Sequence, residues 1–187
     1  LRIVSTLSSD KMIGLFSWIL KGRGFFVSPP GTYEVLEHRV TLELQDIKGK
    51  KAVYRKRQRI RFTQDNVFAY QDKAWGDGEI FAEYKCSPGV AVDRYKEGHR
   101  YRVLISFRET KNKGDIETIN IERKILNGFT SSREDWQTEV DHKTGRLSIK
   151  VIFPCKRPPQ TAYIIEQNRT KTTLLDGRHR LKLPDGR

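Results

Sequence analysis

The chain has 187 residues, which is the size of one ordinary domain with room for a small appendage. Hydrophobic residues make up 36% and charged residues 32%, and this balance excludes a protein with several membrane spans. Nine Phe, seven Tyr and three Trp supply large apolar side chains for a core, so general disorder is excluded too.

The first predicted element is an amphipathic helix over residues 10–22. Asp10 offers an N-cap, Gly22 is suited to end the helix, and the apolar residues between them recur at helical spacing. The apolar stripe is far shorter than the roughly 20 residues that cross a bilayer. Trp18 would suit a membrane interface, but packing against the chain's own domain or a partner is the simpler interpretation.

After residue 31 the hydrophobic period changes to two, which predicts strands. Eight or nine antiparallel strands are expected, at 36–44, 54–63, 66–71, 79–85, 100–109, 119–125, 136–140, 147–153 and 163–165. Of these, 136–140 and 147–153 are expected to form a hairpin. No strand alternates with a long helix, which excludes a nucleotide-binding α/β fold. The prediction is an all-β fold: an antiparallel β-sandwich, or a partly closed barrel, with one N-terminal helix.

These elements divide the chain into three parts. Residues 1–31 hold the helix and a linker, 32–167 hold the β-sandwich, and 168–187 form a basic C-terminal segment. The turn sequence Pro184-Asp185-Gly186 predicts a further strand beyond it, so we expect the chain to be a piece of a longer polypeptide.

The residues that carry most enzyme chemistry are scattered. Cys86 and Cys155 lie far apart and have no zinc-ligand spacing, which predicts reduced thiols in a cytoplasmic protein and no metal site. The four histidines do not cluster, and His38 falls on the apolar side of its strand, as a core histidine would. Catalytic and phosphate-binding motifs are missing from the sequence. We therefore predict no enzyme activity, no cofactor and no small-molecule substrate.

One loop leaves an enzyme hypothesis open. Residues 72–79 carry three carboxylates and two glycines, a composition that suits a calcium or magnesium site. Ordinary turn chemistry is the simpler interpretation, because the spacing is not that of an EF-hand and Lys73 opposes a cation. Trp75, in the same loop, is predicted to be either a plug over the sheet end or an exposed interface anchor.

The net charge of +13 is concentrated in two segments. Residues 51–63 contain six basic and no acidic residues, and residues 156–187 contain eight basic against three acidic ones. Residues 64–155 carry equal numbers of each sign. The charge is therefore patterned, and it favours a local contact with something acidic.

The first basic segment has the sharper pattern. If 54–63 is a strand, four arginines project from one face: Arg55, Arg57, Arg59 and Arg61. Neighbours in this row lie roughly 6.6 Å apart. That spacing is close to the phosphate spacing of an extended nucleic-acid strand, and arginine binds phosphate or carboxylate with two parallel donors.

Pairing with the preceding strand decides whether the charge of the four-arginine row is neutralised within the protein. Hairpin pairing about Lys48 is expected to place Glu37 near Arg59, Glu43 near Val53 and Arg39 near Arg57. Two carboxylates would then face five arginines, which leaves an excess unless an adjacent element covers it. A solvated or internally paired face remains the alternative to a binding site.

The sequence thus predicts a non-catalytic recognition or assembly domain of a larger intracellular protein or complex. It would bind an acidic protein surface, or another domain of the same polypeptide, through Arg39 and the four-arginine row. Nucleic-acid binding by the same row is the first alternative, although the tail beyond Tyr163 has no aromatic residue for base stacking. The second alternative is a metal-dependent enzyme that uses residues 72–79.

Overall fold

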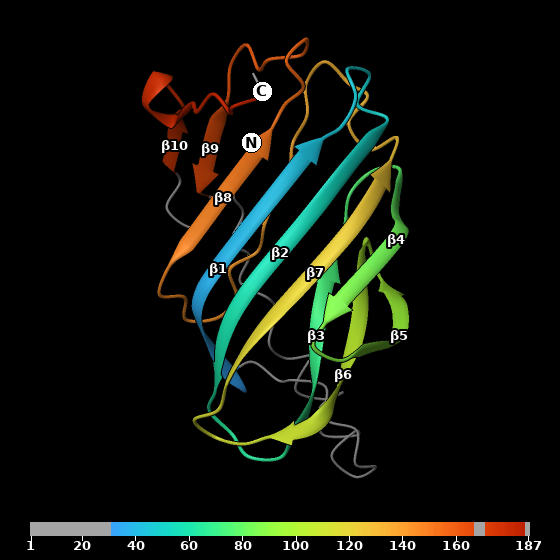
Figure 1. Ribbon diagram of the computed structural model, residues 1–187, viewed down its shortest axis with the longest axis vertical. Helices are drawn as coiled ribbons and strands as arrows, with labels where there is room; N and C mark the ends of the chain where they lie inside the picture. Colours follow the sequence, from blue (N-terminus) through green and yellow to red (C-terminus); the bar gives the residue numbers. More distant parts are fainter. Residues whose placement is uncertain (1–30, 167–170, 186–187) are drawn as a thin grey trace.

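The computed structural model describes residues 31–166 and 171–185, and the regular secondary structure of this part of the chain is almost entirely β-strand (Figure 1). Its strands are β1 (Tyr33–Leu44), β2 (Lys51–Phe62), β3 (Val67–Ala74), β4 (Glu79–Ser87), β5 (Val90–Glu97), β6 (Arg100–Lys111), β7 (Ile116–Leu126), β8 (Leu147–Ile152), β9 (Tyr163–Glu166) and β10 (Lys171–Leu174). One 3-10 turn, η2, spans Gly177–His179. The helix predicted over 10–22, with Trp18, lies outside the described residues. Within the described ranges, no helix has the length and apolar character needed to cross a bilayer.

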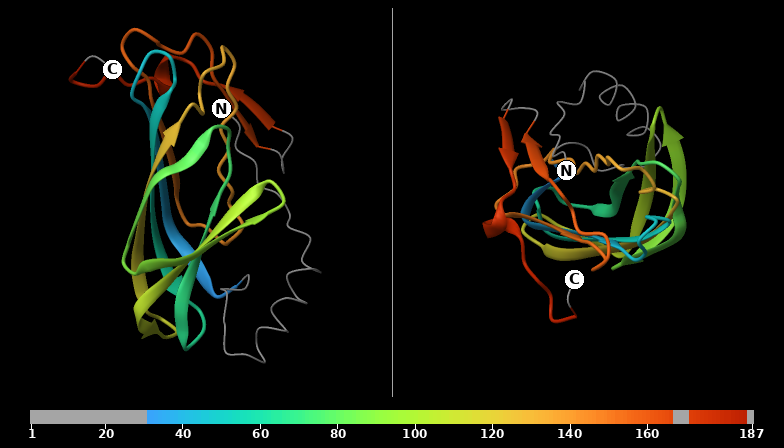
Figure 2. Two further views of the ribbon diagram at one scale, coloured as in Figure 1. Left: turned by 90° about the vertical axis from the view of Figure 1, so that its right-hand side faces the viewer. Right: turned by 90° about the horizontal axis from the view of Figure 1, so that it is seen from above.

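The strands form three sheets. The largest has the order β4-β7-β2-β1-β8, a second has β3-β6-β5, and β9 pairs with β10 in a third. Figure 1 shows the five-stranded sheet in front of the three-stranded one, and Figure 2 shows that the sheets do not close into a barrel. The predicted all-β class is confirmed. The boundary expected at residues 167 and 168 lies outside the described residues; the strands before and after it, β9 and β10, pair with each other.

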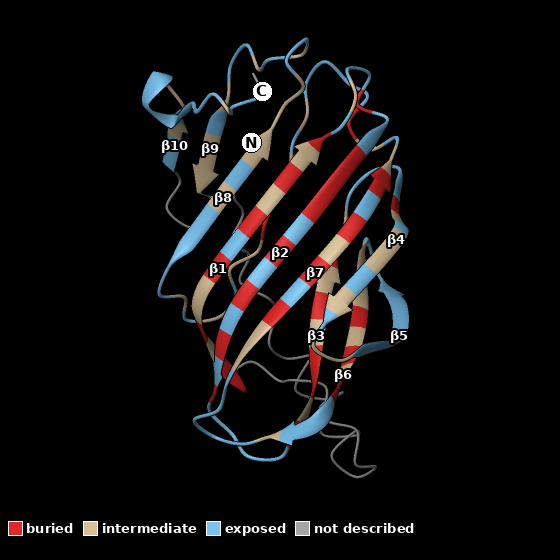
Figure 3. Ribbon diagram, in the orientation of Figure 1, coloured by how far each residue is buried: buried red, intermediate tan, exposed pale blue. Residues whose placement is uncertain are grey.

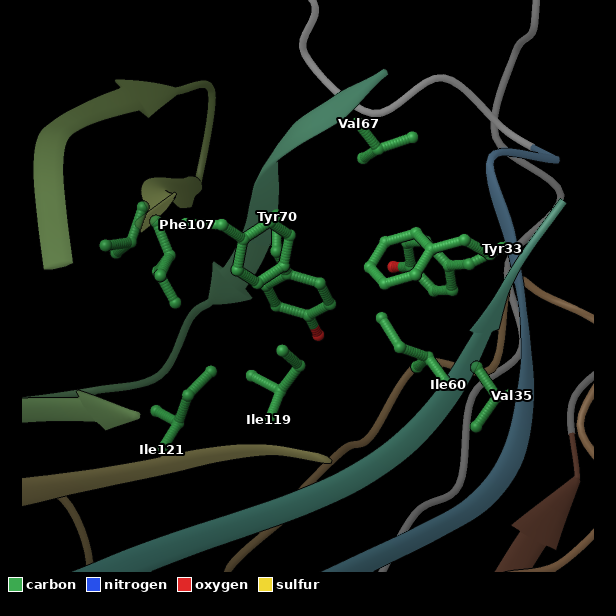
Figure 4. Close-up of a cluster of buried hydrophobic side chains, with 11 residues drawn as sticks. Tyr33, Val35, Ile60, Val67, Tyr70, Phe107, Ile119 and Ile121 are labelled. Atoms are coloured by element: carbon green, nitrogen blue, oxygen red, sulfur yellow. The ribbon is translucent and has the colours of Figure 1, made fainter. Parts of the chain in front are cut away.

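The core lies between the five-stranded and three-stranded sheets. One buried cluster joins Ile60 and Ile119 of the larger sheet to Tyr70 and Phe107 of the smaller one, and Figure 4 shows these side chains converging. A second cluster lies further along β1 and β2, around Leu42 and other apolar residues. Because alternate residues of each strand face this core, the outer face of the five-stranded sheet is left to polar side chains.

The β1–β2 hairpin has the predicted register. Glu37 lies opposite Arg59, Glu43 opposite Val53, and Arg39 opposite Arg57. The turn between the two strands is organised by Asp46, whose carboxylate accepts hydrogen bonds from the backbone N–H groups of Lys48, Lys50 and Lys51. This local turn chemistry fixes the register, and the register decides which side chains reach the outer face.

The strand prediction was wrong between β7 and β8. Residues 136–140 are not a strand, and β8 pairs in parallel with β1 where an antiparallel hairpin was expected. The connection packs by its side chains: Trp136 lies against Tyr54, with ring centroids 6.1 Å apart, and Thr138 is buried. The apolar alternation of residues 136–140 comes from side chains that contact the core, and it resembles the pattern of a strand.

Two further strands were missed. The stretch that forms β5 was expected to be part of a long loop between the strands at 79–85 and 100–109. In the structure it is a strand, and all eight of its residues are exposed. β10 lies in the segment predicted to be a basic tail and pairs with β9, Leu174 opposite Tyr163. Both strands are held by backbone pairing with a neighbour, so their own sequences carry little signal.

Candidate partner-binding face

Strict alternation along β2 produces the candidate site. The four arginines of the predicted row, at 55, 57, 59 and 61, are all exposed, and the residues between them are all buried. Figure 3 shows this as alternating exposed and buried bands along β2. Because β2 is the central strand of the five-stranded sheet, the row runs down the middle of that face.

Neighbouring strands neutralise the outer members of the row. Arg55 donates to Glu43 of β1 at 2.8 Å and to Glu122 of β7 at 2.7 Å. The hydrogen bond to Glu43 is the main reason that the pKa of Arg55 lies above its ordinary value. Arg61 forms an ion pair of 2.8 Å with Glu34. These two guanidiniums are therefore fixed across the sheet.

The two arginines between them are different. Among the described residues, no carboxylate lies within ion-pair distance of the Arg57 or Arg59 side chain. Glu37 stands opposite Arg59 in the register, but its carboxylate accepts from Arg39 at 2.7 Å, and that hydrogen bond lowers the pKa of Glu37. We call Arg57 and Arg59 the central arginine pair.

The surroundings of the central arginine pair are neutral on the β7 side. Asn120 lies opposite Arg57 and Thr118 opposite Arg59. On the other side, Arg57 faces Arg39, a like charge that is already bound to Glu37. The pair therefore presents two guanidinium groups to solvent with their donors available to an external acceptor.

The rest of the face mixes both signs. On β4 and β7, Glu83 is shared between Lys85, at 2.6 Å, and Lys124, and these contacts lower its pKa to about 2. On β8, Lys150 lies opposite Thr41. The exposed aromatic side chains of the described residues are Tyr95 and Tyr163, which lie on β5 and β9. The arginine face thus offers charge without a stacking platform.

The 72–79 loop does not gather its carboxylates. Asp72 points into the core and binds Lys56 at 2.5 Å, and the described part of the chain contains no group of three or more His, Cys, Asp or Glu side chains arranged as metal ligands. Trp75 is half-buried, with the Arg100 guanidinium 5.4 Å from its ring centroid. It lies between the two predicted alternatives, partly covered and partly exposed.

The interior holds a polar network that was not anticipated. Lys56 donates to Asp72 and to the Tyr70 hydroxyl, which donates to Gln58 at 2.7 Å, while the Tyr84 hydroxyl donates to the second oxygen of Asp72. Alternation along β2 places Lys56 and Gln58 on the inner face, and this alternation is the sequence feature that could have predicted buried polar groups. Their partners come from other strands, which the sequence does not pair.

His38 belongs to the same inner face. It is 3% exposed, as predicted for a core histidine, and burial lowers its pKa to about 4, with the Lys56 charge acting in the same direction. Further along this inner face, the buried Arg123 guanidinium lies 4.2 Å from the Tyr54 ring centroid. Cys86 and Cys155 are both free thiols, Cys86 half-buried and Cys155 exposed.

Comparison with protein-family models and with curated proteins finds no match. Among solved structures, the chain is similar in part to an M1 zinc metallopeptidase mutant from Deinococcus radiodurans, bound to a Tyr-Ser-Ala substrate. The identity is 10%, the TM-score is 0.38, and the match covers 75% of this chain. The chain spans about a third of that protein, 34% of its length.

Proposed function

We propose that the chain is a non-catalytic recognition or assembly module that binds an acidic protein partner through the outer face of its five-stranded sheet. The observation that carries this proposal is the central arginine pair: two exposed guanidiniums on a central strand, without a carboxylate partner in the described chain. A partner that supplies carboxylates there gains charge-assisted, two-donor hydrogen bonds and displaces no internal ion pair.

The pattern of charge on the face favours an acidic protein over nucleic acid. Carboxylates from three strands, Glu37 and Glu43 on β1, Glu122 on β7 and Glu83 on β4, are interspersed among the cations. A phosphate backbone that crosses the sheet would meet these negative charges repeatedly. Single-stranded nucleic acid would also need exposed aromatics, and those of the described residues lie on other sheets.

Catalysis is not part of the proposal, and one supporting observation is that three reactive groups of the interior bind one another. The Lys56 ammonium, the Asp72 carboxylate and the Tyr70 hydroxyl form a mutually satisfied network inside the core. The burial that raises the pKa of Tyr70 well above its ordinary value keeps this hydroxyl protonated. Such a network supports the sheet packing without exposing a nucleophile.

The proposal is tested with poly-L-glutamate and with single- and double-stranded DNA as probes, in fluorescence anisotropy titrations at low and at physiological salt. The test variant is Arg57→Glu/Arg59→Glu. Its matched control is Lys48→Glu/Lys113→Glu, which makes the same change of net charge at exposed turn positions. We expect the test variant to lose at least roughly tenfold in affinity for polyglutamate, about 1.4 kcal/mol, and the control to lose far less.

Equal losses in the two variants would mean that net charge alone attracts the probe, which contradicts a site at the central arginine pair. DNA binding that exceeds polyglutamate binding, falls steeply with salt and depends on Arg57 and Arg59 would replace the proposal with the nucleic-acid alternative.

A further inference from the structure

We infer, on the basis of the proposed function, that the acidic partner binds as an extended segment with a carboxylate at every second residue, aligned along β2. The central arginine pair sets this requirement, since Arg57 and Arg59 are two positions apart on one face of a strand. Residues related in this way in an antiparallel strand lie about 6.8 Å apart. Side chains of an extended ligand repeat at the same distance, so consecutive carboxylates meet consecutive guanidiniums.

The spacing between adjacent strands of the sheet favours an extended ligand over a helical one. Adjacent strands of a sheet lie about 4.8 Å apart, and a helix with its side chains is about 10–12 Å across. An acidic helix centred on β2 would therefore also cover β1 and β7, where it would meet Glu37 and Glu122. A single extended strand is narrow enough to lie over Arg57 and Arg59 without covering β1 and β7.

The two outer arginines of the row limit how many contacts the ligand can make with it. Arg55 is held by Glu43 and Glu122, and Arg61 by Glu34, so both are already occupied. Two acidic residues of the ligand, two positions apart, would bind the central arginine pair. Acidic residues further along the ligand would compete with the protein's own carboxylates for Arg55 and Arg61. The face is thus expected to select the spacing of a short acidic motif, and to gain little from a longer acidic run.

The experiment compares three peptides of about twelve residues with equal numbers of glutamates. In the first, Glu alternates with Ser; in the second, Glu-Glu alternates with Ser-Ser; in the third, Glu occurs at helical spacing in an alanine-rich sequence. Affinities are measured by isothermal titration calorimetry against the unmodified protein and against Arg57→Gln/Arg59→Gln. This variant removes both free charges without breaking an ion pair among the described residues, and circular dichroism verifies its fold.

We expect the alternating peptide to bind roughly fivefold more tightly than either of the others, which corresponds to about 1 kcal/mol. This preference should disappear in the Arg57→Gln/Arg59→Gln variant. Equal binding of the three peptides, still dependent on the central arginine pair, would overturn the spacing inference and leave the proposed function intact. No binding of any acidic peptide or of polyglutamate would overturn both. Preferential binding of a single-stranded oligonucleotide would overturn both in favour of nucleic acid.

Discussion

The ammonium of Lys56 lies 2.5 Å from Oδ1 of Asp72 in the interior of the protein, where the two side chains are 9% and 1% exposed. This contact links the inner face of β2 to β3 and so joins two different sheets. Burial alone would lower the pKa of Lys56, but the charge of Asp72 reverses the effect and raises it. The Lys56 ammonium therefore keeps its charge and also donates to the hydroxyl of Tyr70, while the hydroxyl of Tyr84 donates to Asp72.

Breaking this pair from one side is expected to be costly. Asp72→Leu leaves a buried ammonium without its counter-charge, and Lys56→Met leaves a buried carboxylate, so each should lower the free energy of unfolding by about 3–5 kcal/mol. The double variant should cost much less than the sum, because it removes both charges together. Urea denaturation of the four proteins measures the coupling. Additive losses would show that the two residues act independently.

Much of the candidate face follows from local sequence. The alternation of arginine along β2 and the turn at Asp46 are short-range features, and together they determined the register that places Arg39 beside Arg57. Which arginines are free is not a local property. Arg55 is neutralised partly by Glu122, which is 67 positions away in the chain, and only the pairing of β2 with β7 brings them together.

The errors in the predicted fold also arise because pairing between strands is not a local property of the sequence. A strand such as β5, with every residue exposed, is specified by the neighbour that it pairs with and not by its own alternation. The parallel placement of β8 beside β1 depends on where the connection before it crosses the core. Residues 136–140 carry an apolar period of two because one side of that connection packs on Tyr54 and its neighbours. Period alone does not separate these cases.

His38 predicts a stability change with pH. Its pKa is about 4 in the folded protein, where burial disfavours the charged form, against an ordinary value of 6.5. Between these values the unfolded chain binds a proton that the folded chain does not, so stability should rise with pH from about 4 to 6.5 and be lost as pH falls through this window. The full effect is on the order of 3 kcal/mol.

This prediction is checked by urea denaturation at several pH values between 4 and 7, with His38→Gln as the comparison. Carboxylates also titrate near the lower end of the range, so the relevant quantity is the difference in slope between the two proteins. We expect the variant to show a shallower dependence above pH 5. Parallel curves would indicate that His38 does not resist protonation in the folded state.

Removal of the central arginine pair should barely affect stability. Arg57→Ala and Arg59→Ala break no ion pair within the described residues, so each should change the free energy of unfolding by less than about 0.5 kcal/mol. Arg55→Ala removes contacts with both Glu43 and Glu122, and because these groups are partly exposed the loss should stay near about 1 kcal/mol. Thermal and urea unfolding test this order. A large loss for Arg57→Ala would assign it a structural role and weaken the case for a binding site.

Two glycines in turns provide a matched test of the packing at the end of the β1–β2 hairpin. Gly49 and Gly98 both adopt positive φ, +69° and +61°, so alanine at either position should cost roughly 1–2 kcal/mol in backbone strain. At Gly98 the added methyl group meets no atom within 4 Å. At Gly49 it would overlap the backbone carbonyl of Phe129, which also accepts a hydrogen bond from Arg157 at 2.9 Å.

Gly49→Ala should therefore destabilise the protein by at least about 2 kcal/mol more than Gly98→Ala, since the backbone after β7 must move to admit the methyl group. The movement would also disturb the hydrogen bond from the Phe129 N–H to the Gly49 carbonyl, 3.1 Å long. Urea denaturation of the two variants gives the difference directly. Equal losses would show that the segment at Phe129 yields easily, and that the end of the hairpin is not held against it.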